Sequence, residues 1–278
     1  MVKRTSVFDL WSQKGKKKWP QTHIDNAKEA EAAYQAGIEI ISCEPDHHFK
    51  EVRKVAPTAF LSVGLRHGSV SSPQEAIKYG FEILEMGADA VYCSHSIYFI
   101  EAMAKEGIPI TSHVGLVPNL STWTNFRAVG KTAEEALQVC QKVKDLENAG
   151  AACVEVEVVP IEVADHITKN TKMITMGMGC GDVCDTQYLF CNDILGTNTC
   201  ISSKYVITKK ILCITNIPTS HSHRNHFRIF CNMVCYFNGN YLYFYTSSTS
   251  IFKIFNLLTY LECFFCCFPN CSKVGPSG

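Results

Sequence analysis

The chain has 278 residues, a length that fits one barrel-sized domain of about 200–250 residues or two smaller domains. It carries 26 Lys and Arg against 26 Asp and Glu, so its formal net charge is zero. This balance gives no reason to expect nucleic acid or an anionic membrane as a partner. The basic start, residues 1–19, lacks the apolar stretch of a signal peptide. We expect a cytoplasmic protein, with a mitochondrial leader as the alternative.

Up to residue 196 the sequence alternates between predicted helices and apolar strands. Helices are expected at 25–37, 71–87, 96–107 and 131–150, and each ends in a glycine. Glycine favours the left-handed conformation in which a chain leaves a helix sharply. An apolar segment follows each helix within two residues. The six expected strands cover 38–43, 59–65, 88–93, 108–115, 151–159 and 173–179.

Helices that alternate with buried strands indicate a parallel sheet. The last strand ends in glycines, but their spacing is not that of a dinucleotide-binding loop. Gly177, Gly179 and Gly181 fail the Gly-x-Gly-x-x-Gly pattern because Asp182 stands where the third glycine is required. Without that fingerprint, six strands in series favour a (β/α)8 barrel of the TIM type over a doubly wound sheet. Such a barrel carries its chemistry at the carboxyl ends of its strands.

Two of the expected strands end in residues suited to acid–base chemistry. Strand 108–115 contains Ser112 and His113, and a histidine at this rim is either a structural hydrogen-bonding residue or a catalyst. Strand 151–159 contains Glu155 and Glu157, which lie two residues apart and therefore on one side of the strand. These glutamates either turn toward solvent or a helix, or face the mouth of the barrel. Desolvation there raises a carboxylate's pKa, so that it can serve as a general base.

The same segments resemble the ketopantoate hydroxymethyltransferase (3-methyl-2-oxobutanoate hydroxymethyltransferase) family. "ITSHVGLVPN" is similar to the family's Gly-His-(Ile/Leu)-Gly-Leu-Thr-Pro-Gln segment. Residues 130–196 follow the family's Gly-(Arg/Lys)-Thr-x-Glu-Glu-Ala helix, then Glu-(Cys/x)-Val-Pro, then Ile-Gly-Ile-Gly-Ala-Gly. The opening "TSVFDLWSQKGKKKW" is similar to Thr-Val-x-Asp-Leu-x-x-Leu-Lys-Gly-Lys. The resemblance covers residues 5–196 and is strongest from 108 onward.

The resemblance implies a (β/α)8 barrel of the phosphoenolpyruvate mutase-like superfamily that assembles into homo-oligomers. It also implies transfer of a hydroxymethyl group from 5,10-methylenetetrahydrofolate to a small 2-oxo acid, 3-methyl-2-oxobutanoate. The product is 2-dehydropantoate, in pantothenate biosynthesis, and the family's cofactor is Mg²⁺. Glu157 matches the catalytic glutamate and His113 the active-site histidine. Ser112, Gly177 and Gly179 are then expected at the substrate.

The sequence departs from the family pattern at the metal site. The family's Val-Gly-Asp-Ser metal loop is "SCEPDH" here, so the candidate Mg²⁺ ligands are Glu44 and Asp46, in a shifted register. The second metal aspartate, in Ala-Asp-Leu-Pro, aligns with Gly64. The family's Val-Lys-Leu-Glu-Gly-Gly strand end is "VYCSHS", which puts Tyr92 at the lysine and Ser94 at the glutamate.

These matches to the family and departures from it leave three candidate functions. His113 and Glu157 favour a hydroxymethyltransferase of the family's kind. The changes at positions 64 and 92 favour another 2-oxo-acid C–C bond enzyme of the same superfamily, or a non-catalytic relative that binds a small acid.

Composition changes abruptly after Gly196. Residues 197–278 contain no Ala, Asp or Gln, and Glu262 is their only acid. We interpret 1–196 as the catalytic-type domain and 197–278 as translated non-coding sequence, such as a retained intron or a frameshift. The barrel would then be incomplete at its carboxyl end, because the family's last helices are missing. Two alternatives for this segment are a zinc site built from its His and Cys, and a membrane span at 251–268.

Overall fold

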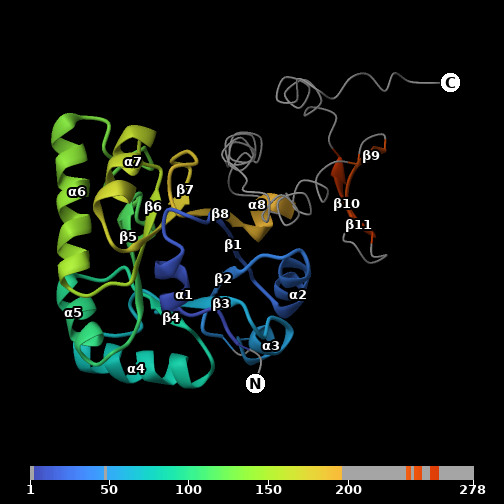
Figure 1. Ribbon diagram of the computed structural model, residues 1–278, viewed down its shortest axis with the longest axis horizontal. Coiled ribbons are helices and arrows are strands. Elements are labelled where there is room, and N and C mark those ends of the chain that lie inside the picture. Colours follow the sequence, from blue (N-terminus) through green and yellow to red (C-terminus); the bar gives the residue numbers. More distant parts are fainter. Residues whose placement is uncertain (1–2, 47–48, 196–235, 239–240, 246–250, 257–278) are drawn as a thin grey trace. The chain divides into compact units, whose positions relative to one another are not determined.

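A computed structural model describes residues 3–46, 49–195, 236–238, 241–245 and 251–256 (Figure 1). The chain divides into two compact units, residues 1–191 and 192–278. The first unit contains a closed barrel of eight parallel strands, each hydrogen-bonded to the next, and β1 pairs with β8 to complete the ring. The strands are β1 Trp19–His23, β2 Ile40–Cys43, β3 Phe60–Gly64, β4 Ala90–Tyr92, β5 Ile110–Gly115, β6 Cys153–Glu157, β7 Ile174–Met178 and β8 Thr186–Phe190.

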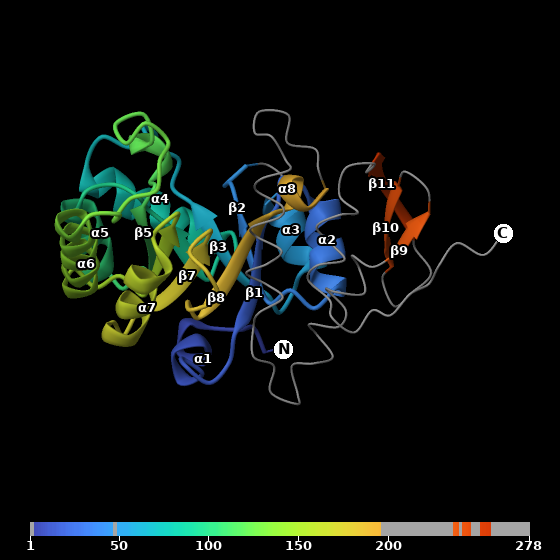
Figure 2. The same ribbon diagram turned by 90° about the horizontal axis from the view of Figure 1, so that it is seen from above.

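Helices surround the strands on the outside of the barrel (Figures 1 and 2). One helix follows every strand except β7, which runs directly into β8. The α-helices are α1 Val7–Ser12, α2 Ala27–Gln35, α3 Phe49–Val55, α4 Pro73–Glu85, α5 Ile97–Lys105, α6 Ala133–Asn148, α7 Ile161–Asn170 and α8 Cys191–Leu195. A 3-10 turn, Pro118–Leu120, lies between β5 and α6.

The expected (β/α)8 barrel is confirmed, and all six expected strands and four expected helices are present. The glycines that end α2, α4, α5 and α6 all have positive φ, between 78° and 111°, as a left-handed helix end requires. Strands β1 and β8, which the sequence pattern did not indicate, complete the ring, so the described strands close the barrel by Phe190. Helix α8 follows β8 and is described as far as Leu195.

The barrel is closed at the end where its strands begin. Helix α1 lies across this end (Figure 2), and Leu10 from α1 packs among the first residues of several strands. This core cluster comprises Leu10, Trp19, Ile40, Phe60, Ala90, Ala152, Cys153, Ile174 and Met176. The indole N–H of Trp11 donates to the carbonyl of Ala152 at 3.2 Å. Helix α1 thus acts as an apolar cover that buries the lower interior of the barrel.

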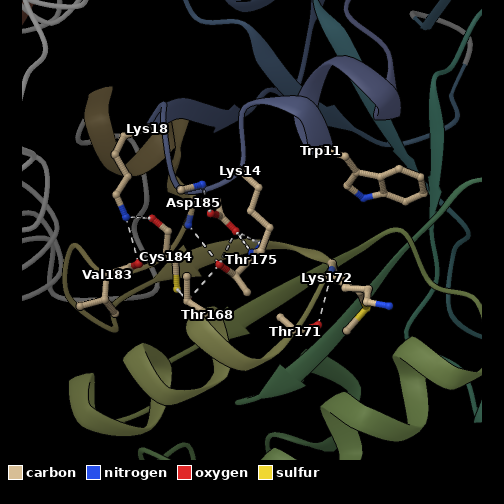
Figure 3. A network of polar contacts seen from close by, with 12 residues as sticks. Trp11, Lys14, Lys18, Thr168, Thr171, Lys172, Thr175, Val183, Cys184 and Asp185 are labelled. Atoms are coloured by element: carbon tan, nitrogen blue, oxygen red, sulfur yellow. Dashed lines mark hydrogen bonds and ion pairs between the residues drawn. The ribbon is translucent and has the colours of Figure 1, made fainter.

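A buried carboxylate, Asp185, joins three segments at this closed end (Figure 3). It is 2% exposed, and one of its oxygens accepts hydrogen bonds from the backbone N–H and the hydroxyl of Thr175, both at 2.9 Å. The same oxygen forms an ion pair with the Lys14 ammonium. The backbone N–H of Gly15 lies 3.4 Å from the other oxygen. Asp185 therefore ties the segment after α1 to the start of β7 and the approach to β8.

The link from β7 to β8 is too short to contain a helix, and it folds back over the outer face of β7. A Cβ at Gly177 would lie 2.9 Å from the Cys184 Cβ and 3.0 Å from the Cys180 Sγ. The two sulfurs are 3.6 Å apart and both side chains are buried. Gly181 has a φ of +84°. The alternate glycines noted in the sequence thus allow this link to lie flat against the barrel wall.

The seven cysteines of residues 1–196 are thiols and not half-cystines. Five of them are buried, and Cys140 and Cys191 are partly exposed. Burial raises the pKa of the Cys43 and Cys153 thiols to about 12. These thiols act as small apolar core side chains.

Beyond Leu195 the structure describes a small antiparallel sheet, in the strand order β11-β10-β9. Its strands are β9 Tyr236–Asn238, β10 Tyr241–Tyr245 and β11 Ile251–Asn256. Strand β11 occupies the first part of the proposed membrane span, and the rest of that span lies outside the described residues, as do the candidate zinc ligands. Among the described residues, no helix has the length and apolar character needed to cross a bilayer.

Candidate active site

A cavity of about 300 Å³ opens at the end of the barrel where the strands finish. All eight strands contribute to its lining, which follows from the arrangement of strand ends around a closed ring. One side carries His113 and the two glutamates of β6. Another carries Met178, Tyr188 and Phe190, and the two aromatic rings stack at 5.4 Å with an interplanar angle of 8°. The cavity therefore combines ionisable groups with an apolar wall.

His113 lies between the two glutamates of the neighbouring strand. Strands β5 and β6 are paired so that His113 is beside Glu155 and Gly115 beside Glu157. The His113 Nε2 lies 3.2 Å from a Glu157 oxygen, and its Nδ1 lies 3.6 Å from a Glu155 oxygen. The His113 and Glu155 side chains are buried, whereas the Glu157 side chain is 22% exposed. Glu157 is thus the more accessible carboxylate.

Burial sets the protonation of Glu155 and of two tyrosines in the cavity. Desolvation, and then the charge of Glu157, raise the pKa of Glu155 well above its ordinary value of 4.5, which favours the uncharged form of this carboxyl group. Desolvation also raises the pKa of Tyr92 and of Tyr188 well above 10, and both phenols remain protonated donors. The Tyr92 hydroxyl is 2.8 Å from His113 Nδ1.

The backbone around Glu157 is tightly constrained. Gly115 has a φ of +90°, and a Cβ there would come within 2.1 Å of the Glu157 carbonyl oxygen. That carbonyl accepts a hydrogen bond from the N–H of Leu116 at 2.9 Å. Val158 has a φ of +50°, a strained conformation for a β-branched residue. Its N–H donates to the Met178 carbonyl at 2.8 Å. Neighbouring strands therefore hold Glu157 in place against local strain.

The rim contains the residues expected to bind a metal ion. The Glu44 carboxylate occupies the space next to Gly64, where a Cβ would lie 3.3 Å from one of its oxygens. Glu44 also forms a long ion pair with Arg66 at 3.7 Å. Asp46 does not line the cavity. In the part of the chain that the structure describes, His, Cys, Asp and Glu form no group of three or more able to hold a metal ion.

The structure brings together only some of the residues expected at the site. His113, Glu157 and Glu44 line the cavity. Ser112 is 1% exposed and lies outside the lining, because side chains alternate along a strand and its neighbour His113 faces inward. Gly177 and Gly179 do not line the cavity either, since Gly177 faces the thiols of the β7–β8 link.

Sequence reasoning alone did not assign a role to Tyr92, Tyr188 or His23, which also line the cavity. For Tyr92, the available signal in the sequence was its position at the end of an expected strand. Strands β1 and β8 were not expected at all, so His23 and Tyr188 carried no such signal. Burial lowers the pKa of His23, which favours its neutral form.

The fold and the site together define a class: a (β/α)8 barrel protein with a histidine–carboxylate pair at the carboxyl ends of neighbouring strands. The profile of the ketopantoate hydroxymethyltransferase family matches residues 24–214. The chain belongs to this family. The match starts later and ends later than the motifs in the sequence indicated, and its last part extends beyond the barrel strands into residues that the structure does not describe.

Individual relatives support the assignment. The 3-methyl-2-oxobutanoate hydroxymethyltransferase of Geobacillus sp. (strain WCH70) is 34% identical over 169 residues, which are 59% of this chain and 61% of that protein. The enzyme of the same name from Pseudothermotoga lettingae is 35% identical over 164 residues, 57% of this chain and 62% of that protein. This chain therefore spans about three fifths of the length of these two curated relatives.

Solved structures share the fold at low sequence identity. The carboxyl transferase domain of Rhizobium etli pyruvate carboxylase superposes with a TM-score of 0.50 at 12% identity, covering 68% of this chain and 42% of that chain. A 2,3-dimethylmalate lyase superposes with a TM-score of 0.49 at 11% identity, covering 74% and 78%. The first of these likenesses shows the barrel fold.

Proposed function

We propose that the protein transfers a hydroxymethyl group from 5,10-methylenetetrahydrofolate to 3-methyl-2-oxobutanoate, giving 2-dehydropantoate for pantothenate biosynthesis. Family membership supports the reaction, and the position of Glu157 is the observation that carries it. Glu157 is a partly exposed carboxylate at the mouth of the barrel, 3.2 Å from a buried histidine. The adjoining wall of Met178, Tyr188 and Phe190 suits the branched aliphatic end of this 2-oxo acid.

In this proposal Glu157 is the general base. It removes the proton from C3 of the 2-oxo acid, and the electron pair of that C–H bond becomes an enolate. The enolate carbon then forms a bond to the methylene carbon as one of the two C–N bonds of that carbon to the folate breaks. A water molecule replaces the folate nitrogen at the second C–N bond, which supplies the hydroxyl group and releases tetrahydrofolate. His113 Nε2 has no hydrogen-bond acceptor within bonding geometry, and this N–H can bind an oxygen of the substrate. Base catalysis of this kind contributes about 10²–10⁴-fold to a rate.

The family's Mg²⁺ does not fit the described residues. Glu44 lines the rim beside Gly64 and forms an ion pair with Arg66, and Asp46 does not line the cavity. Among the described residues, His, Cys, Asp and Glu form no group of three or more that could hold the ion. The expected ligation of Mg²⁺ by Glu44 and Asp46 stays a prediction.

Exchange of the C3 proton tests the proposal, because it reports the first step without the folate. The wild-type chain is incubated with 3-methyl-2-oxobutanoate in D2O, with and without Mg²⁺, and the loss of the C3 proton signal is followed by NMR. We expect exchange that falls by about 10²-fold or more in the Glu157→Gln variant. A folded wild-type protein with no exchange above this variant would exclude the proposed reaction.

A second function is favoured by the departures at positions 64 and 92. These changes suit an enzyme of the same superfamily that acts on a different 2-oxo acid, or a non-catalytic relative that binds a small acid. Calorimetry with Mg²⁺ separates the alternatives. Tight stoichiometric uptake that is lost in Glu44→Gln would weaken the non-catalytic reading, whereas binding of 2-oxo acids without turnover would support it.

The remaining features concern the setting of this activity. We propose that residues 1–196 carry it and that 197–278 are not a native domain, and sequencing of transcripts across codon 196 tests this.

A cytoplasmic location is supported by the thiols of the barrel. A homo-oligomer is supported by exposed apolar side chains between β5 and α6, where Trp123 is 85% and Phe126 68% exposed. Sedimentation of the wild type and of Trp123→Ser measures the assembly.

A further inference from the structure

The shortest polar contact of His113 in the cavity is with the hydroxyl of Tyr92. Tyr92 is the last residue of β4, and His113 lies on the adjacent strand β5. The Tyr92 hydroxyl is 2.8 Å from His113 Nδ1, and the two rings meet edge to face with centroids 5.9 Å apart. The Glu155 oxygen is farther from the same nitrogen, at 3.6 Å. Tyr92 is therefore the hydrogen-bond partner of Nδ1.

Which of the two groups donates this hydrogen bond follows from the surroundings of Nε2, on the other side of the imidazole ring. If Nδ1 carried the proton and donated to the phenol, the lone pair of Nε2 would lie only 3.2 Å from the Glu157 carboxylate. Two lone pairs would then oppose each other in a buried place, where electrostatic repulsion is strong. If the phenol donates to Nδ1, Nε2 carries the proton and faces the carboxylate with its N–H. The second arrangement is favoured.

We infer that Tyr92 is a positioning residue that holds His113 in the neutral tautomer protonated on Nε2. The inference rests on the proposed function for its effect on the reaction, but the tautomer itself does not depend on that function. The groups that face His113 are Tyr92 from β4 and Glu155 and Glu157 from β6. Burial raises the pKa of Glu155 and so favours its uncharged form, which attracts a proton onto Nδ1 less than a carboxylate would.

As a consequence, the Nε2–H of His113 is a hydrogen-bond donor with a fixed direction. The Nε2–H is held toward the base and the cavity, where it can bind the oxygen on which charge develops as the proton leaves C3. Without the Tyr92 hydroxyl, Nδ1 loses its hydrogen-bond donor and only the Glu157 carboxylate still favours the proton on Nε2. A larger fraction of molecules then carries the proton on Nδ1 and presents a lone pair to the substrate instead. That fraction is inactive, so the loss is expected in kcat, while KM for the 2-oxo acid changes little.

The test measures the tautomer directly by NMR on the full chain, labelled with ¹⁵N-histidine and without substrate. A His113→Asn sample assigns the His113 signals. We expect the wild type to show an unprotonated Nδ1 and a protonated Nε2, and Tyr92→Phe to show a mixture of the two tautomers. Tyr98→Phe, at a tyrosine that is 65% exposed and outside the cavity, is the matched control and should leave the signals unchanged.

The kinetic arm uses the C3-proton exchange assay. Tyr92→Phe is expected to lower kcat about tenfold with little change in KM, the effect of losing one hydrogen bond of ordinary strength. Protonated Nδ1 in the wild type, or an unchanged tautomer in Tyr92→Phe, would overturn the inference whether or not the variant is active. Absence of exchange in the wild type together with the expected tautomers would reject the proposed function alone.

Discussion

The two ends of the barrel both bury acidic side chains, but they treat them differently. At the closed end, Asp185 has an ion pair and hydrogen bonds from Thr175, and α1 covers the apolar interior below. At the open end, Glu155 is buried without a cation beside it, and the His113 Nε2 has no partner within bonding geometry. The difference indicates that the closed end stabilises the fold, whereas the open end gives up stability for chemistry.

The largest effect on stability is expected at Lys14. Lys14→Met removes the cation and leaves the Asp185 charge buried, a change that typically costs about 3–5 kcal/mol. Urea unfolding followed by tryptophan fluorescence measures it. Lys16→Met is the matched control, because the Lys16 ammonium is exposed and donates only to a backbone carbonyl of α1, that of Ser12. Equal stabilities of the two variants would mean that Asp185 does not depend on Lys14.

The β7–β8 link should be sensitive to a single added methyl group. Gly177→Ala places a Cβ 2.9 Å from the Cys184 Cβ and 3.0 Å from the Cys180 Sγ, and overpacking of this kind costs about 1–3 kcal/mol. The same urea assay measures the loss. Gly64→Ala is the control, because the nearest atom there is a Glu44 oxygen at 3.3 Å, which ends a flexible side chain. A mild effect at 177 would show that the link moves easily.

Glu155 should make stability depend on pH. Its folded pKa is raised above the ordinary 4.5, so the folded protein keeps a proton that the unfolded chain releases. The free energy of unfolding therefore falls as pH rises above 4.5, by up to about 1.4 kcal/mol per pH unit, until the folded group also ionises. Glu155→Gln removes this contribution. Urea unfolding at pH 5 and pH 7 should show a shallower decline in the variant, and parallel declines would contradict the prediction.

A substitution at Val158 tests whether the backbone strain beside Glu157 is maintained for function. Val158→Gly relieves the positive φ and should raise the free energy of unfolding by about 1 kcal/mol. The same change loosens the backbone next to the base, so the rate of C3-proton exchange should fall. A variant that loses stability would indicate that the packing of Val158 outweighs its strain.

The smallest effect is expected on the surface, away from both ends. Asp165 and Lys169 form an exposed ion pair one turn apart on α7. Asp165→Ala should cost only about 0.3–0.5 kcal/mol in urea unfolding at low salt, and less at high salt. A loss as large as that of Lys14→Met would mean that burial does not decide the strength of charge pairs in this barrel.

Much of the fold could be predicted from the sequence because its signals are local. Helix-ending glycines and apolar runs located β2 to β7. Strand β1 was missed because Pro20 and the polar residues of "WPQTH" interrupt any apolar run, and its interior packing is created only by ring closure. Strand β8 was missed because it follows β7 without a helix, so the expected alternation breaks there.

The site could be predicted only in part, for the same physical reason. His113 and Glu157 were expected at the site because strand ends and family motifs both point to them, and both line the cavity. Ser112 and Gly177 were also expected there but do not line it, because the sequence indicates the direction of a strand more readily than which side chains face inward. The partner of His113 is a contact between neighbouring strands, and no spacing within one strand reports which hydroxyl will reach which ring nitrogen.

Gly115 has a consequence for how freely this barrel can vary. A side chain there would collide with the carbonyl of Glu157, on which the alignment of the next strand depends. In a saturation library, a screen for folding alone and a screen for enzymatic activity should therefore both keep glycine at this position. At Tyr92 the two screens should diverge, with folding tolerating phenylalanine and activity rejecting it. Position 115 thus belongs to the architecture and to the chemistry at once.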